Sequence, residues 1–174
     1  MKKNIRIHIS FLALLVFASP VFAADPDPLE PLKLRIGTWT VKTVSKKAEW
    51  TPKTVTSTAT EKIQFYLDKK FIQGNSKVTT DNRKGMWLAN YESASKTYRF
   101  WYFNNTNSYP VGNSIGRWNS RTRIMTWSTD LGNGNLGTAI WTFPTADRFE
   151  WAFKVRNREG TLMLDMSAVA TRKK

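Results

Sequence analysis

Short segments rich in Thr, Val, Trp, Tyr and Phe recur along the chain from Leu34 onward, and residues typical of turns separate them. Branched and aromatic side chains fit the pleated surface of a sheet, whereas Gly, Asn, Asp and Ser stabilise the backbone of turns. The segments are eight to twelve residues long in most cases and nearly evenly spaced, so the pattern predicts ten strands and no amphipathic helix. We expect these strands over residues 36–46, 53–67, 70–80, 84–94, 97–104, 110–119, 121–129, 135–143, 147–157 and 160–172.

Apolar and polar residues alternate clearly in several of these segments. Phe149, Trp151, Phe153 and Val155 fall on one face of their strand, and the charged Arg148, Glu150, Lys154 and Arg156 fall on the other. Short connections make successive strands antiparallel neighbours, and closure into a barrel removes the exposed edges of so long a meander. We therefore expect an all-β fold, a single antiparallel up-and-down β-barrel of about eight to ten strands. In segments 97–104 and 121–129 the alternation leaves open which face points inward.

The first 23 residues have a different pattern. Lys2, Lys3 and Arg6 precede a short apolar run, and small residues before Ala24 suit a cleavage site. The apolar run is too short to cross a bilayer, so we expect a signal peptide over 1–23 and no transmembrane anchor. The resulting domain organisation is a signal peptide, a solvated Pro- and Asp-rich linker over 24–33 and a barrel over 34–174. The expected location is the periplasm or the medium.

Removal of the signal changes the chemistry available to the chain. The full sequence has 27 basic and 13 acidic residues, and without its leader 24 basic residues remain, for a net charge near +11. The sole histidine, His8, leaves with the leader, and the chain contains no cysteine. Catalytic sites built on histidine or cysteine, the usual zinc sites and disulfides therefore cannot form. We expect no metal and no other cofactor.

The strand that opens the barrel begins Leu34-Arg-Ile-Gly-Thr-Trp39, which resembles the Gly-x-Trp opening of the calycin superfamily of lipocalin-like barrels. In that superfamily a basic residue on the last strand lies over this Trp, and Arg172 is in the corresponding place here, where a cation–π contact would hold it. The ordered series Tyr91–Phe103, Gly116–Trp118, Arg123–Trp127 and Asp147–Trp151 resembles the exported bacterial domain of unknown function 1579 family. The resemblance implies a calycin-like barrel and no particular reaction. Haem-binding relatives use a histidine, which this mature chain lacks.

Tryptophans occur almost once per strand, and they can either fill the interior or line a cavity for a small apolar or aromatic ligand. Glu61 is an acid on an otherwise apolar face. Such a carboxylate needs a basic partner or hydrogen bonds, unless a bulge turns it outward. Our leading hypothesis is a non-enzymatic, monomeric, ligand-binding barrel. Its candidate ligand-binding residues are Trp39, Glu61, Trp87, Trp101, Trp127, Trp141, Trp151 and Arg172.

Two alternatives remain open at this point. In the first, the barrel is filled and its basic exterior is drawn weakly to anionic envelope surfaces or polysaccharides, without specific binding of nucleic acid. In the second, two carboxylates act as general acid and base in a hydrolase. Only Glu61, Glu150 and Asp165 lie within strands away from the turns, and no spacing pairs them. We therefore assign no catalytic residue.

Overall fold

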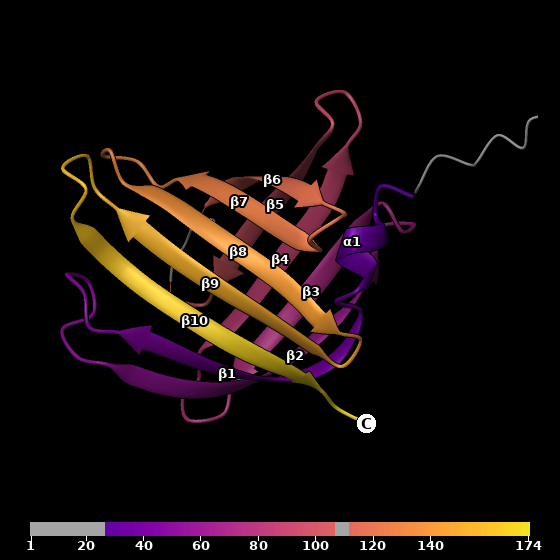
Figure 1. Cartoon of the computed structure of the whole chain (residues 1–174). Helices are drawn as coiled ribbons and strands as arrows, with labels where there is room; N and C mark the ends of the chain where they lie inside the picture. Colours follow the sequence, from indigo (N-terminus) through magenta and orange to yellow (C-terminus); the bar gives the residue numbers. More distant parts are fainter. Residues whose placement is uncertain (1–26, 107–111) are drawn as a thin grey trace, which may run out of the picture.

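Ten antiparallel strands form one closed barrel in the computed structural model, which describes residues 27–106 and 112–174 (Figure 1). Each strand pairs with the next along the chain, and the first strand pairs with the last to close the barrel. The all-β up-and-down barrel predicted from the sequence is therefore confirmed. The strands are β1 (Gly37–Lys46), β2 (Val55–Tyr66), β3 (Phe71–Val78), β4 (Lys84–Glu92), β5 (Thr97–Asn104), β6 (Asn113–Asn119), β7 (Ile124–Asp130), β8 (Leu136–Thr145), β9 (Arg148–Arg156) and β10 (Leu162–Arg172).

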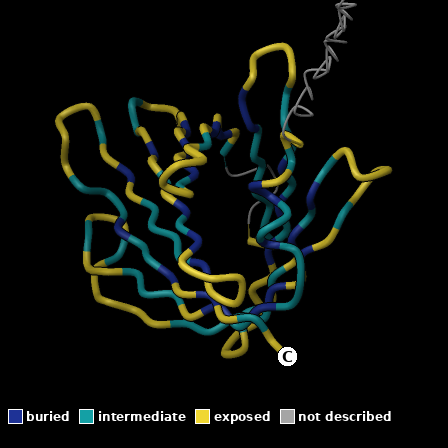
Figure 2. The backbone as a smooth tube through the Cα atoms, turned by 45° about the vertical axis from the view of Figure 1, so that its right-hand side comes forward, coloured by how far each residue is buried: buried dark blue, intermediate teal, exposed yellow. Residues whose placement is uncertain are grey.

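The register decides the two faces that the sequence left open. On β5, Phe100 contacts rings of Trp87, Trp127 and Trp141, so the face with Tyr98, Phe100 and Tyr102 points into the barrel. On β7 the inward face carries Met125, Trp127 and Thr129, all of which are buried. Exposed residues concentrate in the hairpin turns and loops (Figure 2).

One end of the barrel is closed by the short helix α1 (Glu30–Lys33), which precedes β1 (Figure 1). The predicted signal peptide, 1–23, lies outside the described residues. The prediction that 24–33 is a solvated linker is wrong for its described part, because Leu32 is only 1 % exposed and belongs to the core. Pro31 suits the first turn of a helix, since it has no amide hydrogen to leave unpaired there. An apolar helical turn is more stable against the open ends of ten strands than in water.

The segment before α1 is fastened to the barrel wall by Tyr98, whose hydroxyl donates a hydrogen bond of 2.8 Å to the carbonyl oxygen of Pro28. Burial, with smaller contributions from the neighbouring Tyr91 and Asp27, raises the pKa of Tyr98 to about 12. Because the pKa in the folded state lies above the ordinary value of 10.0, Tyr98 contributes stability that is fully present below pH 10. This contribution is lost as the pH rises from 10 towards 12.

The Tyr98→Phe variant tests this contribution. We expect it to cost about 1 kcal/mol near neutral pH, the usual value of one hydrogen bond. Urea unfolding at about pH 8 and about pH 11 should show a smaller loss of stability at high pH in the variant than in the wild type. Tyr66→Phe is the matched control, since Tyr66 is 41 % exposed. An equal loss in wild type and Tyr98→Phe would contradict the prediction.

Candidate functional site

The interior of the barrel has two halves with different packing. The half next to α1 is filled by aromatic rings, and Trp39, Trp127 and Phe149 there are at most 1 % exposed. Trp127 and Trp141 lie with ring centroids 4.8 Å apart, and Trp39 meets Phe149 edge-on at the same distance. Such pairs add to the stabilisation that burial provides. This half has the character of a packed core.

A buried ion pair lies within this aromatic packing. One guanidinium nitrogen of Arg35, Nη2, donates to Oε2 of Glu61 at 2.9 Å, and both side chains are less than a tenth exposed. The other carboxylate oxygen, Oε1, accepts the indole N–H of Trp87 at 2.6 Å. Glu61 therefore faces inward with both oxygens bonded, as the sequence required of a buried carboxylate. The alternative of a bulge that exposes Glu61 is wrong.

Arg35 is surrounded by rings. Its guanidinium carbon lies 4.5 Å from the ring centroid of Trp87, 4.2 Å from that of Trp141 and 4.4 Å from that of Phe149. Burial lowers the pKa of Arg35, and the negative charge of Glu61 opposes this effect. Cation–π contacts and the carboxylate together compensate the cost of removing the charge from water. The pair therefore anchors the residues before β1 to the middle of the core.

The position of Trp87 requires a glycine on the next strand. Gly74 is the register partner of Trp87 across β3 and β4, and a Cβ atom at this glycine would come within 2.1 Å of the indole ring. The absence of a side chain lets the indole lie flat against β3 and turn its N–H to Glu61. Gly74 thus sets the direction of the hydrogen bond that holds Glu61.

The predicted contact between Arg172 and Trp39 is confirmed. The guanidinium carbon of Arg172 lies 4.2 Å from the ring centroid of Trp39, and its nitrogens donate to the carbonyl oxygens of Ile36 and Ala146. The indole N–H of Trp39 donates to the carbonyl oxygen of Arg35 at 2.7 Å. These bonds join β10 to the residues before β1 at the closed end, so both side chains fasten the barrel there.

The half of the barrel away from α1 is packed differently. Several of its inward positions on β1–β3, β5 and β8–β10 are only partly buried. Its inward side chains Ser114, Thr129 and Val155 are buried. Solvent therefore reaches these partly buried inward side chains from this end of the barrel. The accessible side chains in the register of the inward face are Thr43, Ser45, Ser57, Ala59, Ser76, Tyr102, Ala139, Trp151, Phe153, Leu164 and Met166.

This accessible half has a polar wall and an apolar wall. Small hydroxyl side chains line it on β1, β2 and β3, whereas Trp151, Phe153 and Met166 line it on β9 and β10. Tyr102 of β5 reaches the polar wall, since its hydroxyl and the Oγ of Ser76 both lie close to Gly85 of β4. Burial raises the pKa of Tyr102, and the charge of Glu61 raises it further, so its hydroxyl stays protonated and can donate or accept a hydrogen bond. The arrangement suits a molecule with an apolar body and polar groups.

The structure separates the eight candidate residues. Trp39, Glu61, Trp87, Trp127 and Trp141 lie inside the packed half, Trp151 lines the accessible half and Arg172 closes the far end. Including Trp101 among residues for an interior ligand was wrong, since its ring lies on the outer face of β5 and contacts Phe71. Arg35 and the hydroxyl wall were missed. Arg35 could be recognised only by its place between the apolar Leu34 and Ile36.

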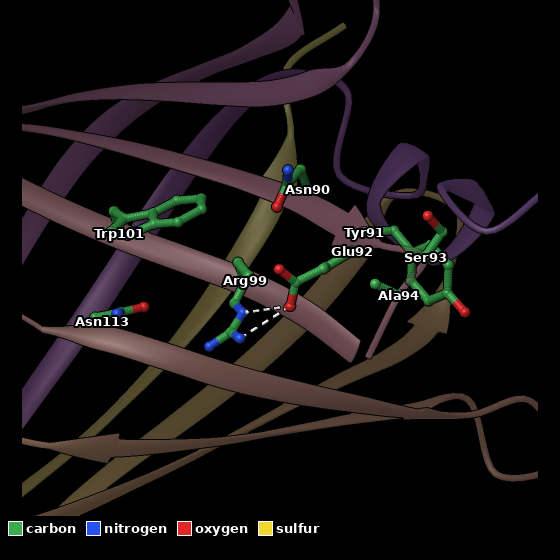
Figure 3. A pocket seen from close by; sticks show the side chains of 8 residues that line it. All are labelled: Asn90, Tyr91, Glu92, Ser93, Ala94, Arg99, Trp101 and Asn113. Carbon is green, nitrogen blue, oxygen red and sulfur yellow. Dashed lines mark hydrogen bonds and ion pairs between the residues drawn. The ribbon is translucent and has the colours of Figure 1, made fainter. Parts of the chain in front are cut away.

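A hollow of about 500 Å³ lies beside Trp101 on the outer surface, between β4, β5 and β6 (Figure 3). Arg99 crosses it and donates from Nε and Nη2 to Oε2 of Glu92, at 3.1 and 2.9 Å. Hydrogen bonds from Ser95 and Arg99 lower the pKa of Glu92. The charged residues of this hollow, Arg99 and Glu92, therefore pair with each other, so neither is free to bind a charged ligand.

Neither a metal-binding cluster nor a membrane-spanning helix occurs in residues 27–106 and 112–174. No group of three or more His, Cys, Asp or Glu side chains could hold a metal ion there. No helix in these ranges is long and apolar enough to cross a membrane.

Comparison with known proteins shows the fold and no closer relationship. No family model and no curated protein match the chain. The structure of the S-type phycobiliprotein lyase CPES from Guillardia theta is similar with a TM-score of 0.56 and 11% identity, over 82% of this chain and 90% of that one. Rv2717c from M. tuberculosis gives a TM-score of 0.49 and 10% identity, over 84% of this chain and 98% of that one. The chain is a closed ten-stranded antiparallel barrel with aromatic clusters in its interior, and it shares this fold with the lyase structure.

Proposed function

We propose that the barrel reversibly binds one small molecule with a largely apolar or aromatic body, in the half away from α1, without transforming it. The observation that carries this proposal is the partial exposure of inward side chains such as Trp151, Phe153 and Tyr102. A fully packed barrel would bury them, since protein interiors tolerate few voids. Binding sites are typically apolar hollows with a few placed polar groups.

The two walls suggest how a ligand would be held. Its apolar body would lie against Trp151, Phe153 and Met166, where burial supplies most of the affinity. Its polar groups would face Tyr102 and the hydroxyls of β1 to β3, which fix its orientation. Arg35 and Glu61 are paired with each other beneath this space, so they shape its floor more than they offer free charge.

The hydrolase alternative loses support from the positions of the acids. Asp165 lies on the outer face of β10 beside Lys154, with 3.9 Å between the charged atoms, and Glu150 is paired with Arg148 on the outer face of β9. Within the described strands, Glu61 is the one carboxylate that faces inward. Two carboxylates flanking one bond, as glycoside hydrolysis requires, do not occur there.

The residues before the described part support a further proposal about location. Met1–Ala23 has the basic start, the apolar run and the small residues of a signal peptide. A ligand-binding role outside the cytoplasm, in a monomer that resembles the exported domain of unknown function 1579 family, agrees with these features. Edman sequencing of the exported protein should begin at Ala24, and retention of Met1 would contradict export by cleavage.

Blocking the accessible half tests the binding proposal. We expect Ser57→Trp to lower uptake of the apolar fluorescent probe 1-N-phenylnaphthylamine by roughly tenfold or more, because the indole would occupy the space beside Thr43. Thr56→Trp is the matched control, since Thr56 lies next to it on β2 and is exposed. Fluorescence titration of both variants and the wild type measures the effect.

Native mass spectrometry of gently purified protein complements the titration. A reproducible added mass that Ser57→Trp lacks and Thr56→Trp keeps would identify the natural ligand. Equal probe uptake by both variants, or no uptake by the wild type together with a bare mass, would overturn the proposal. Circular dichroism of each variant excludes misfolding as the cause.

A further inference from the structure

The outer face of β3, β4 and β5 is unusually apolar for a surface. Met86 and Leu88 point outward from β4 and pair with Phe103 and Trp101 of β5, respectively. Phe71 of β3 reaches the same area, with 6.3 Å between its ring centroid and that of Trp101. All five side chains are partly exposed. A continuous group of this kind on a surface typically marks a site of interaction.

Three exposed lysines border this apolar group on one side. Lys62 projects from β2, and Lys77 of β3 lies directly opposite Lys84 of β4. Like charges directly opposite each other destabilise a sheet. None of the three forms an ion pair within the described parts of the chain, and the nearby Asp81 is already paired with Arg83 at 2.9 Å. The position therefore carries positive charge that the protein itself does not neutralise.

A groove joins the lysines to the apolar group. Its volume is about 550 Å³, and the side chains that line it include those of Lys62, Lys77, Lys84, Asn75, Met86 and Phe103. Met86 and Phe103 supply apolar lining, and the three lysines supply positive charge. Long basic side chains can cover apolar surface with their stems and still keep their charges in water. An occupant must be negatively charged and apolar at once.

We propose that this basic aromatic face, formed by Phe71, Met86, Leu88, Trp101 and Phe103 with Lys62, Lys77 and Lys84, docks the barrel on the surface of an anionic lipid bilayer. Lysines are attracted by anionic headgroups, and aromatic side chains insert at the boundary between headgroups and acyl chains. A soluble polyanion would use the lysines alone and would leave the five apolar side chains without a role. The groove lies outside the barrel, so docking is independent of a ligand in the interior.

Binding to vesicles of phosphatidylcholine with about one third phosphatidylglycerol tests the proposal. Each lysine near such a surface is worth roughly fivefold in partitioning, so we expect the triple variant Lys62→Gln, Lys77→Gln and Lys84→Gln to lose on the order of 100-fold. The triple variant Lys154→Gln, Arg156→Gln and Arg158→Gln is the matched control. It removes the same charge from β9 and the turn after it, five strands from β4 around the barrel.

A second pair of variants tests the apolar part of the face. Phe103→Ser should weaken binding roughly tenfold, and the effect should persist in about 1 M salt, which screens charges but not apolar contacts. Ile140→Ser, at an exposed position on β8, should leave binding unchanged. If both triple variants lost vesicle binding equally, net charge alone would account for the binding, and the proposal would be overturned. The proposal would also be overturned if Phe103→Ser bound vesicles as well as the wild type and soluble polyphosphate competed for binding. Failure of the wild type to bind the vesicles would overturn it as well.

Discussion

Replacing Glu61 by glutamine is expected to lower the free energy of unfolding by about 3–5 kcal/mol, because it leaves the buried charge of Arg35 without a counterion. Arg35 is 3 % exposed, so water cannot take over the role of the carboxylate. Glutamine keeps an oxygen for the indole N–H of Trp87, so the loss reports on the charge and not on that hydrogen bond. Urea unfolding followed by tryptophan fluorescence measures the change.

A double-mutant cycle isolates the pair. Arg35→Met removes the charge that Glu61→Gln leaves unpaired, so the double variant should be less destabilised than the sum of the single variants by about 2 kcal/mol or more. The exposed pair Asp81 and Arg83, with the same separation of 2.9 Å, is the control. Asp81→Asn and Arg83→Met should each change stability by less than about 1 kcal/mol. If Glu61→Gln cost no more than Asp81→Asn, the pair would not anchor the core.

Truncating Leu32 is the second change with a large expected effect. Leu32→Ala should cost about 2–5 kcal/mol, since it leaves a void where α1 packs against the aromatic core. Leu136→Ala is the matched control, because it removes the same atoms from a side chain that is 59 % exposed. It should stay within about 0.5 kcal/mol of the wild type.

Acrylamide quenching adds a local measurement to the Leu32 comparison. Trp39 and Trp127 are at most 1 % exposed beside α1, so loosening of the helix should raise the quenched fraction of the tryptophan emission. We expect the increase in Leu32→Ala and not in Leu136→Ala. A loss of stability without increased quenching would mean that α1 contributes packing energy but does not close the end of the barrel.

The two halves of the interior divide the roles of the aromatic residues. Near α1, the rings around Arg35 form a rigid, closed floor held by Glu61, Gly74 and Arg172. Beyond Trp151, several inward side chains, among them Phe153 and Met166, are partly exposed. For the binding proposed above, a well-packed floor would lower the cost of ordering the site around a ligand.

Much of the fold was predictable from local patterns. The expected strand 97–104 has the observed bounds, and 84–94 and 160–172 differ by two residues at one end each. Strand alternation and turn residues depend only on residues a few positions apart, so both can be recognised from the sequence without tertiary contacts. The contact of Arg172 with Trp39 was accessible in another way, through the resemblance of Gly-x-Trp to a known type of barrel.

The sequence by itself determined the strands, their antiparallel order, the exclusion of sites that need cysteine, and the need of an inward Glu61 for a partner. Tertiary structure alone decided that the partner is Arg35, that Leu32 is core and that Trp101 faces outward. The reason is physical. Alternation and turn chemistry depend on neighbours along the chain, whereas a charge partner 26 residues away or a buried helical turn depends on which segments barrel closure brings together.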